Sequence, residues 1–264
     1  MNRLIFIILF GFIASSTYGQ FYIQPSIGYT FSSHPTEIQS IKIVDNLKTV
    51  YNNNLKYGEG IQLGLNAGCD LWDYFFFEVN TKKTIYSKYN VSIEQKNLRL
   101  LNNFSFRGYF GEIDYESSVF QISPLIGFKV EQNRYAINLK IGPNFMKSTI
   151  TQTLTYIDWE FDNWERYPLN TIKKYAYSGK FQMGLQVDLG FCYSLKENLQ
   201  LVVDFVTVYN NFKNSKSAIK YYEIDGVNHL YKMDETNTND DFGNLKLNHS
   251  HNGINVGIKY VFNK

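Results

Sequence analysis

The sequence has little of what several protein classes require. Its two cysteines cannot build a disulfide framework, and no paired Cys/His spacing indicates a zinc site. Lys and Arg number 26 against 24 Asp and Glu, and the absence of a basic cluster argues against a nucleic-acid binder. Hydrophobic residues make up 44% of the chain, which is too many for an intrinsically disordered protein. We therefore expect a folded protein that does not bind nucleic acid.

Signature motifs of catalysis are also missing. The sequence contains no Gly-x-Ser-x-Gly elbow, no phosphate-binding Gly-x-x-x-x-Gly-Lys-Ser/Thr and no His-Glu-x-x-His. Its four histidines, His34, His229, His249 and His251, fall in or beside segments that we predict to be loops. Solvated loop histidines are the favoured interpretation, with an enzyme site at a rim as the alternative. We predict no catalytic residues, no metal site and no cofactor.

The N-terminus has the three regions of a secretory signal peptide. Arg3 supplies the positive charge, and an apolar run of 11 residues extends from Leu4 to Ala14. A helix that spans a membrane needs about 20 such residues, so this run is too short to be an anchor. A small and polar stretch then ends at Gly19. We predict a cleavable signal peptide over residues 1–19 and one domain over residues 20–264.

The rest of the chain alternates between apolar and polar residues, as half-buried strands do. Ile61, Leu63 and Leu65, for example, alternate with Gln62, Gly64 and Asn66. Seven further segments alternate in the same way, at 21–29, 75–79, 120–130, 135–145, 181–193, 199–205 and 254–262. The apolar face of such strands points inward in a soluble sandwich or lipocalin, and toward lipid in an outer-membrane barrel.

Connection lengths favour the membrane barrel. The segments are joined alternately by short links, near 72–73, 131–134 and 194–198, and by long ones over 31–59, 82–118, 147–179 and 210–251. Short periplasmic turns that alternate with long outer loops are typical of outer-membrane barrels. Four strands return from the long loops, which implies four outgoing ones. We predict an all-β fold, a single antiparallel up-and-down transmembrane β-barrel of eight strands, with ten as the alternative.

Aromatic residues and charges fit this arrangement. Aromatic side chains stand at both ends of the predicted strands, as in interfacial girdles, although high strand propensity is an alternative explanation. The girdle candidates are Tyr29, Trp72, Tyr135, Phe145, Tyr193, Tyr209, Tyr260 and Phe262. Charges on the polar face are the candidate lumen network: Asp70, Glu78, Lys129, Lys140, Lys180, Asp188, Asp204 and Lys259. Paired charges that plug the barrel are the favoured interpretation, and a water-filled path for small ions is the alternative.

The whole pattern resembles a small bacterial outer-membrane β-barrel. The signal peptide, the short turns, the long loops and the amphipathic final strand over 253–262 are similar to the OmpX type, the OmpA transmembrane domain and the PorT-like barrels of Bacteroidota. The resemblance implies an integral outer-membrane location, contact with outer-membrane lipid and insertion by the barrel assembly machinery. It transfers no catalytic residues.

Four functions are compatible with this sequence. We favour a non-enzymatic integral outer-membrane protein with long extracellular loops that is structural or binds a partner protein outside the cell or in the envelope. The alternatives are a narrow pore or accessory of transport or secretion, a rim enzyme that acts on lipid or peptide, and a soluble secreted β-barrel.

Overall fold

The computed structural model describes residues 19–33, 36–44, 47–55, 59–97, 107–162, 165–230 and 246–262. The predicted signal peptide, up to residue 18, lies outside the described residues. No helix in the described ranges is long and apolar enough to span a membrane. Alternating segments of the sequence form strands, and eight of these build a barrel: β1 (Phe21–Ser32), β4 (Gly60–Asp70), β5 (Phe75–Asn97), β6 (Arg107–Gln132), β7 (Tyr135–Asp162), β9 (Gln182–Lys196), β10 (Leu199–Tyr209) and β14 (His251–Phe262).

The eight strands follow one another around a closed antiparallel ring. Their order is β1, β4, β5, β6, β7, β9, β10 and β14, and β14 pairs with β1 to complete the circle. Tight turns join β4 to β5, β6 to β7 and β9 to β10, and the second of these turns places Asn133 in the left-handed region at φ 56°. The predicted all-β fold with an eight-stranded up-and-down barrel is confirmed. The alternative of ten strands in the barrel is wrong.

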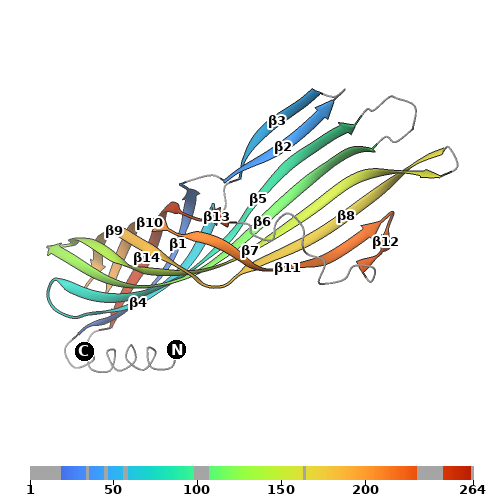
Figure 1. Cartoon of the computed structure of the whole chain (residues 1–264). Coiled ribbons are helices and arrows are strands. Elements are labelled where there is room, and N and C mark those ends of the chain that lie inside the picture. Colours follow the sequence, from blue (N-terminus) through green and yellow to red (C-terminus); the bar gives the residue numbers. More distant parts are fainter. Residues whose placement is uncertain are drawn as a thin grey trace.

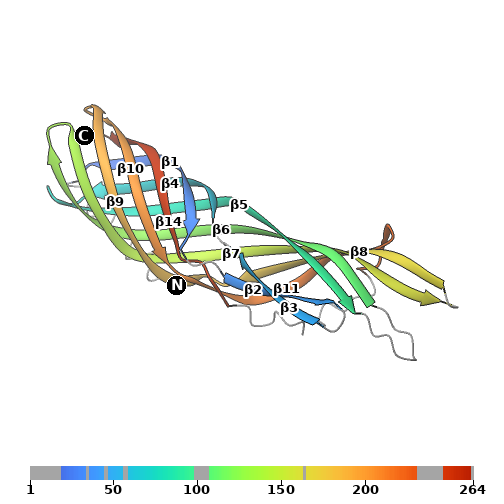
Figure 2. The same cartoon turned by 90° about the horizontal axis from the view of Figure 1, so that it is seen from above.

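Three barrel strands continue far beyond the ring. Over residues 149–162, β7 no longer pairs with β9 but with β8 (Glu165–Gly179), which in turn pairs with β11 (Asn211–Ile224). Together with the distal halves of β5 and β6, these strands form a twisted sheet that leaves the barrel at one end (Figures 1 and 2). We call this sheet the extension, the end from which it leaves the loop end, and the opposite end the turn end.

Short elements complete the extension. The hairpin of β2 (Thr36–Val44) and β3 (Leu47–Leu55) lies beside β5, β12 (Val227–Asn228) turns back onto β11, and β13 (Lys246–Asn248) pairs with the start of β11. The described parts of the four long segments predicted as loops are therefore largely β-structure, which corrects that prediction. Where side chains of the extension are described, outward positions include Asp114 of β6 and Thr149 and Thr155 of β7, so the apolar alternation that marks the barrel strands is lost there.

The barrel is apolar outside and polar inside. Outward side chains such as Leu63 and Val256 are 47% and 43% exposed, whereas the inward Lys140 and Asp188 are at most 1% exposed. On β7 the outward apolar belt runs from Tyr135 to Phe145, 11 residues, which matches the about 9–11 residues of a transmembrane strand. The predicted orientation, with apolar residues outward and polar residues enclosed, is confirmed.

Candidate functional site

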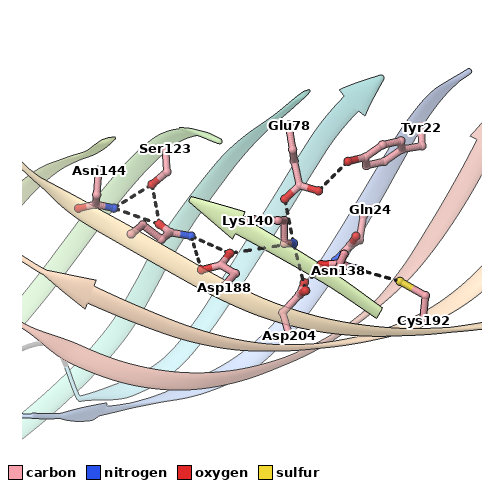
Figure 3. A network of polar contacts seen from close by, with 11 residues as sticks. Tyr22, Gln24, Glu78, Ser123, Asn138, Lys140, Asn144, Asp188, Cys192 and Asp204 are labelled. Atoms are coloured by element: carbon pink, nitrogen blue, oxygen red, sulfur yellow. Dashed lines mark hydrogen bonds and ion pairs between the residues drawn. The ribbon is translucent and has the colours of Figure 1, made fainter. Parts of the chain in front are cut away.

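The polar interior of the barrel centres on Lys140 of β7. Its Nζ lies 3.0 Å from Asp204 Oδ1 and 3.1 Å from Glu78 Oε1, and Asp188 Oδ2 lies at 4.0 Å. The three carboxylates come from three strands, β10, β5 and β9, and they converge on the ammonium group inside the barrel (Figure 3). Because buried charges are costly unless they are paired, this cluster fixes the four strands relative to one another.

Neutral side chains satisfy the remaining oxygens of these carboxylates. The hydroxyl of Tyr22 donates to Glu78 Oε2 at 2.8 Å, and the amide of Gln24 donates to Asp204 Oδ2 at 3.0 Å. Both donors lie on β1, so a fifth strand joins the network. Gly190 makes room for it, because a Cβ there would lie 2.5 Å from Asp204 Oδ1.

A branch of amides leads from this cluster toward the loop end. Gln186 donates to both oxygens of Asp188, at 3.0 and 2.9 Å, and its carbonyl accepts from Ser123 at 2.6 Å. Asn144 donates to Ser123 at 2.8 Å and accepts from Asn210 at 3.0 Å. Together with the Lys140 cluster, these contacts form a continuous polar network from Tyr22, near the turn end, to Asn210, at the loop end.

A separate group of side chains closes the interior at the turn end. Tyr22, Phe76 and Val261 form a buried apolar cluster, and the Lys259 ammonium lies 3.7 Å from the centre of the Tyr22 ring. This arrangement is a cation–π contact in a desolvated position. At the same end of the barrel, Lys129 Nζ lies 2.8 Å from Asp70 Oδ2, and each of these two side chains is less than one-fifth exposed.

The predicted lumen charges fall into three groups. Glu78, Lys140, Asp188 and Asp204 are brought together, while the other three inward charges, Asp70, Lys129 and Lys259, lie toward the turn end. Lys180, the one remaining residue of the eight that were predicted, is exposed and belongs to no lumen network among the described residues. It precedes β9, whose first residue is Gln182, so the strand's alternation does not extend to it.

Sequence reasoning missed three basic residues of the interior. Lys82 of β5 is 3% exposed, and it continues the inward phase of Glu78 beyond the point where the outward positions stop being apolar. His249 and His251 are 0% and 1% exposed, so their prediction as solvated loop residues is wrong. The polar outward residue Asn252 concealed the start of β14, although strict alternation from Gly253 backward would have placed His251 inside.

The predicted girdle residues stand at the two ends of the belt. At the turn end, Trp72 and Tyr135 are 72% and 66% exposed, and the rings of Tyr135 and Tyr193 lie 5.2 Å apart. Tyr260 and Phe262 also make a ring contact, at 5.1 Å. At the loop end Tyr29 and Tyr209 are exposed, and Phe145 is half-buried.

A closed ring with this belt is a membrane structure. No strand edge within the ring is left open, since each of its eight strands has a partner on both sides, as a barrel in hydrocarbon requires. The apolar belt and its aromatic ends have the height and order found in outer-membrane barrels. The chain is therefore an integral outer-membrane β-barrel.

Similarity to known proteins is distant. No protein-family model matches the sequence, and no curated protein matches it either. Among solved structures, the chain is similar to Neisserial surface protein A, at 11% identity over 92% of this chain and 97% of that one, with a TM-score of 0.41. A major outer membrane protein from Thermus thermophilus is 14% identical over 93% of this chain and 100% of that one, with a TM-score of 0.39. The outer membrane protease OmpT from Escherichia coli is 10% identical over 92% of this chain and 97% of that one, with a TM-score of 0.29.

Proposed function

We propose that this protein is a non-enzymatic barrel whose interior is closed and whose extension presents a binding surface for a partner protein. The observation that carries the proposal is the continuation of β5, β6 and β7 past the belt as a paired sheet. In outer-membrane barrels the long connections face the cell exterior, which supports an extracellular position for the extension. The small size and the strand number support the resemblance to the OmpX type, the OmpA transmembrane domain and the PorT-like barrels.

The filled interior argues against a pore. The Lys140 cluster spans the barrel from β5 to β9 and β10, and the apolar cluster of Tyr22 and Phe76 lies between it and the turn end. An eight-stranded barrel is just wide enough for its side chains to fill. We therefore expect ions to find no continuous aqueous path.

The placement of the three described histidines argues against an enzyme at the rim, and the fourth, His34, lies outside the described residues. His249 and His251 are buried inside the barrel instead of lying at an exposed mouth. His229 lies elsewhere, beside Tyr222 in the extension, with ring centroids 6.1 Å apart. Across the described ranges, no group of three His, Cys, Asp or Glu side chains is arranged to hold a metal ion.

The outward face of the extension has the polar character of a protein-binding surface. One cross-strand row joins Asp114, Thr153 and Lys174, so an acidic residue of β6 and a basic residue of β8 flank a threonine of β7. Asn90 donates to Asp114 and to Glu112, at 2.9 and 3.2 Å, which orders the acidic side of this face. Polar rows with both signs of charge give orientation and specificity to a partner of complementary pattern.

Site-specific photocrosslinking on intact cells tests the proposal. A photoreactive residue at Thr155, which is exposed on the outward face, should give a discrete protein adduct. The matched control is the same residue at Leu139, in the centre of the belt, which should label lipid and give no protein adduct. Absence of an adduct at Thr155, or an equal adduct at both positions, would contradict partner binding by the extension.

Conductance tests the closed interior separately. Purified protein in planar bilayers should show no single-channel steps. Regular steps would support the narrow pore instead.

A further inference from the structure

Lys82 is a buried ammonium group whose position the closed-barrel function does not explain. It is 3% exposed, and its Nζ has no hydrogen-bond partner among the described residues. Its side chain passes over Gly64, where a Cβ would lie 3.4 Å from Lys82 Cγ. Asp188 and Asp204 attract it only from a distance, since the ion pairs of these carboxylates are with Lys140. A desolvated ammonium without a direct partner favours a bound counter-group.

Gln121 is the ladder neighbour of Lys82 on the adjacent strand, and it contacts a histidine of β14. Gln121 lies directly opposite Lys82 in the β5–β6 ladder, and its Nε2 is 3.2 Å from His251 Nε2. His251 Nδ1 lies 2.9 Å from the carbonyl oxygen of His249. A carbonyl can only accept, so the proton of the neutral ring is on Nδ1, and Nε2 accepts from the Gln121 amide. Gln121 Oε1 is left buried without a partner among the described residues.

Protonation of His251 reverses this hydrogen bond. The added proton is on Nε2, which then donates, so the Gln121 amide rotates by about 180° to present Oε1 to it. The NH₂ group of Gln121 is thereby released from His251 and becomes a donor in the interior, opposite Lys82. The titratable neighbours of His251 are His249 and Lys82, while its partners on β1 and β10 are Ser32 and Val208.

The charge balance of the whole interior agrees with joint uptake of a proton and an anion. The inward charges are four negative and four positive and sum to zero: Asp70, Glu78, Asp188 and Asp204 against Lys82, Lys129, Lys140 and Lys259. One anion alone would leave an enclosed charge of about −1, and one proton alone would leave +1. Both together keep the interior neutral.

We propose that Lys82, Gln121 and His251 form an enclosed site for one small inorganic anion of halide size, which binds together with a proton on His251. Lys82 Nζ supplies the charge and the rotated Gln121 amide supplies a second donor. The site is separate from the surface of the extension, so it does not depend on the proposed function.

Bromide is a suitable probe. Thermal unfolding in non-ionic micelles is followed by circular dichroism in sodium bromide and in sodium gluconate at equal ionic strength, because gluconate is too large for an enclosed site. At a 100-fold excess over the dissociation constant, bromide should raise the wild-type midpoint by about 5 °C relative to gluconate. The rise should be larger at pH 5 than at pH 7.5. Equal midpoints in the two salts at both pH values would overturn the proposal.

Two lysine variants locate the effect. Lys82→Met should lose the bromide response, whereas Lys180→Met, which removes an exposed lysine, should keep it. Retention of the response in Lys82→Met would overturn the site. If that variant does not fold, anomalous diffraction from wild-type crystals grown in bromide decides the question. A bromide peak beside Lys82 Nζ supports the site, and solvent density without anomalous signal there overturns it.

Discussion

At the scale of single residues, Lys140 holds the barrel interior together. Its ammonium group lies within hydrogen-bonding distance of carboxylates from β5 and β10, and a third carboxylate, from β9, lies at 4.0 Å. Removing one partner of a buried ion pair is more costly than removing both, because the remaining charges stay desolvated. The network therefore stabilises one arrangement of strands, and it also occupies the space through which ions would pass.

Lys140→Met should destabilise the barrel by about 3–5 kcal/mol, because it leaves Glu78 and Asp204 without their cation. The free energy of unfolding in urea, measured in lipid vesicles, checks this. Lys147→Met is the matched control, since Lys147 is exposed on the same strand and its loss should cost less than about 0.5 kcal/mol. Equal effects of the two substitutions would contradict a central role of Lys140.

The sequence allowed a residue-level prediction wherever apolar and polar positions alternate strictly. Lys140, Asp188 and Asp204 are such cases, because their apolar neighbours define the inward phase. Lys82 was missed because its outward neighbour Lys83 is not apolar. Contacts such as Tyr22 to Glu78 join residues 56 positions apart, and they form because β1 and β5 both pair with β4, which puts the two residues in one cross-strand row.

At the scale of elements, the long strands change their character where they leave the membrane. On β7 the outward residues are aliphatic at Ile137, Leu139 and Ile141, and they become Thr149, Thr151 and further threonines in the extension. The same strand thus serves a lipid-facing and a water-facing sheet. Apolar alternation predicted the first part, whereas the second part lacked that signal and was predicted to be a loop.

Leu139→Arg should destabilise the barrel by about 2–4 kcal/mol, because the side chain would face hydrocarbon near the middle of the belt. Unfolding from vesicles measures the change in free energy. Thr149→Arg places the same side chain on the same face of the strand, beyond the belt, and should be near neutral. If the two substitutions have the same cost, the belt does not lie where the exposed aliphatic residues place it.

The extension should be sensitive to alkali. Tyr115 lies beyond the belt, is 6% exposed, and burial raises its pKa to about 12. The folded state therefore favours the neutral phenol, while the unfolded chain ionises near pH 10. This contribution to stability is present below pH 10 and is lost as the pH rises toward 12. Limited proteolysis of the extension should accelerate between pH 10 and pH 12, and the substitution Tyr115→Phe should weaken this acceleration. If the variant keeps the same pH dependence, other groups cause the effect.

At the scale of the whole molecule, the structure combines a closed barrel with a sheet that projects from it. Alternation and connection lengths were sufficient to predict the closed barrel and its strand number, because both follow from the chemistry of lipid and water. The extension could not be predicted in this way, since its pairing depends on β8 and β11, which meet only after β7 has left the ring.

The most direct test of the closed membrane barrel is spin-label accessibility along β7, with Cys69 and Cys192 first replaced. Labels at Ile137, Leu139 and Ile141 should collide readily with oxygen dissolved in the bilayer, because these positions face lipid. A label at Asn138 or Asn144 should be shielded both from oxygen and from a water-soluble nickel complex, because the interior is filled. Ready access of nickel to Asn138 and Asn144, or no alternation in oxygen access along the strand, would contradict a sealed barrel in the membrane.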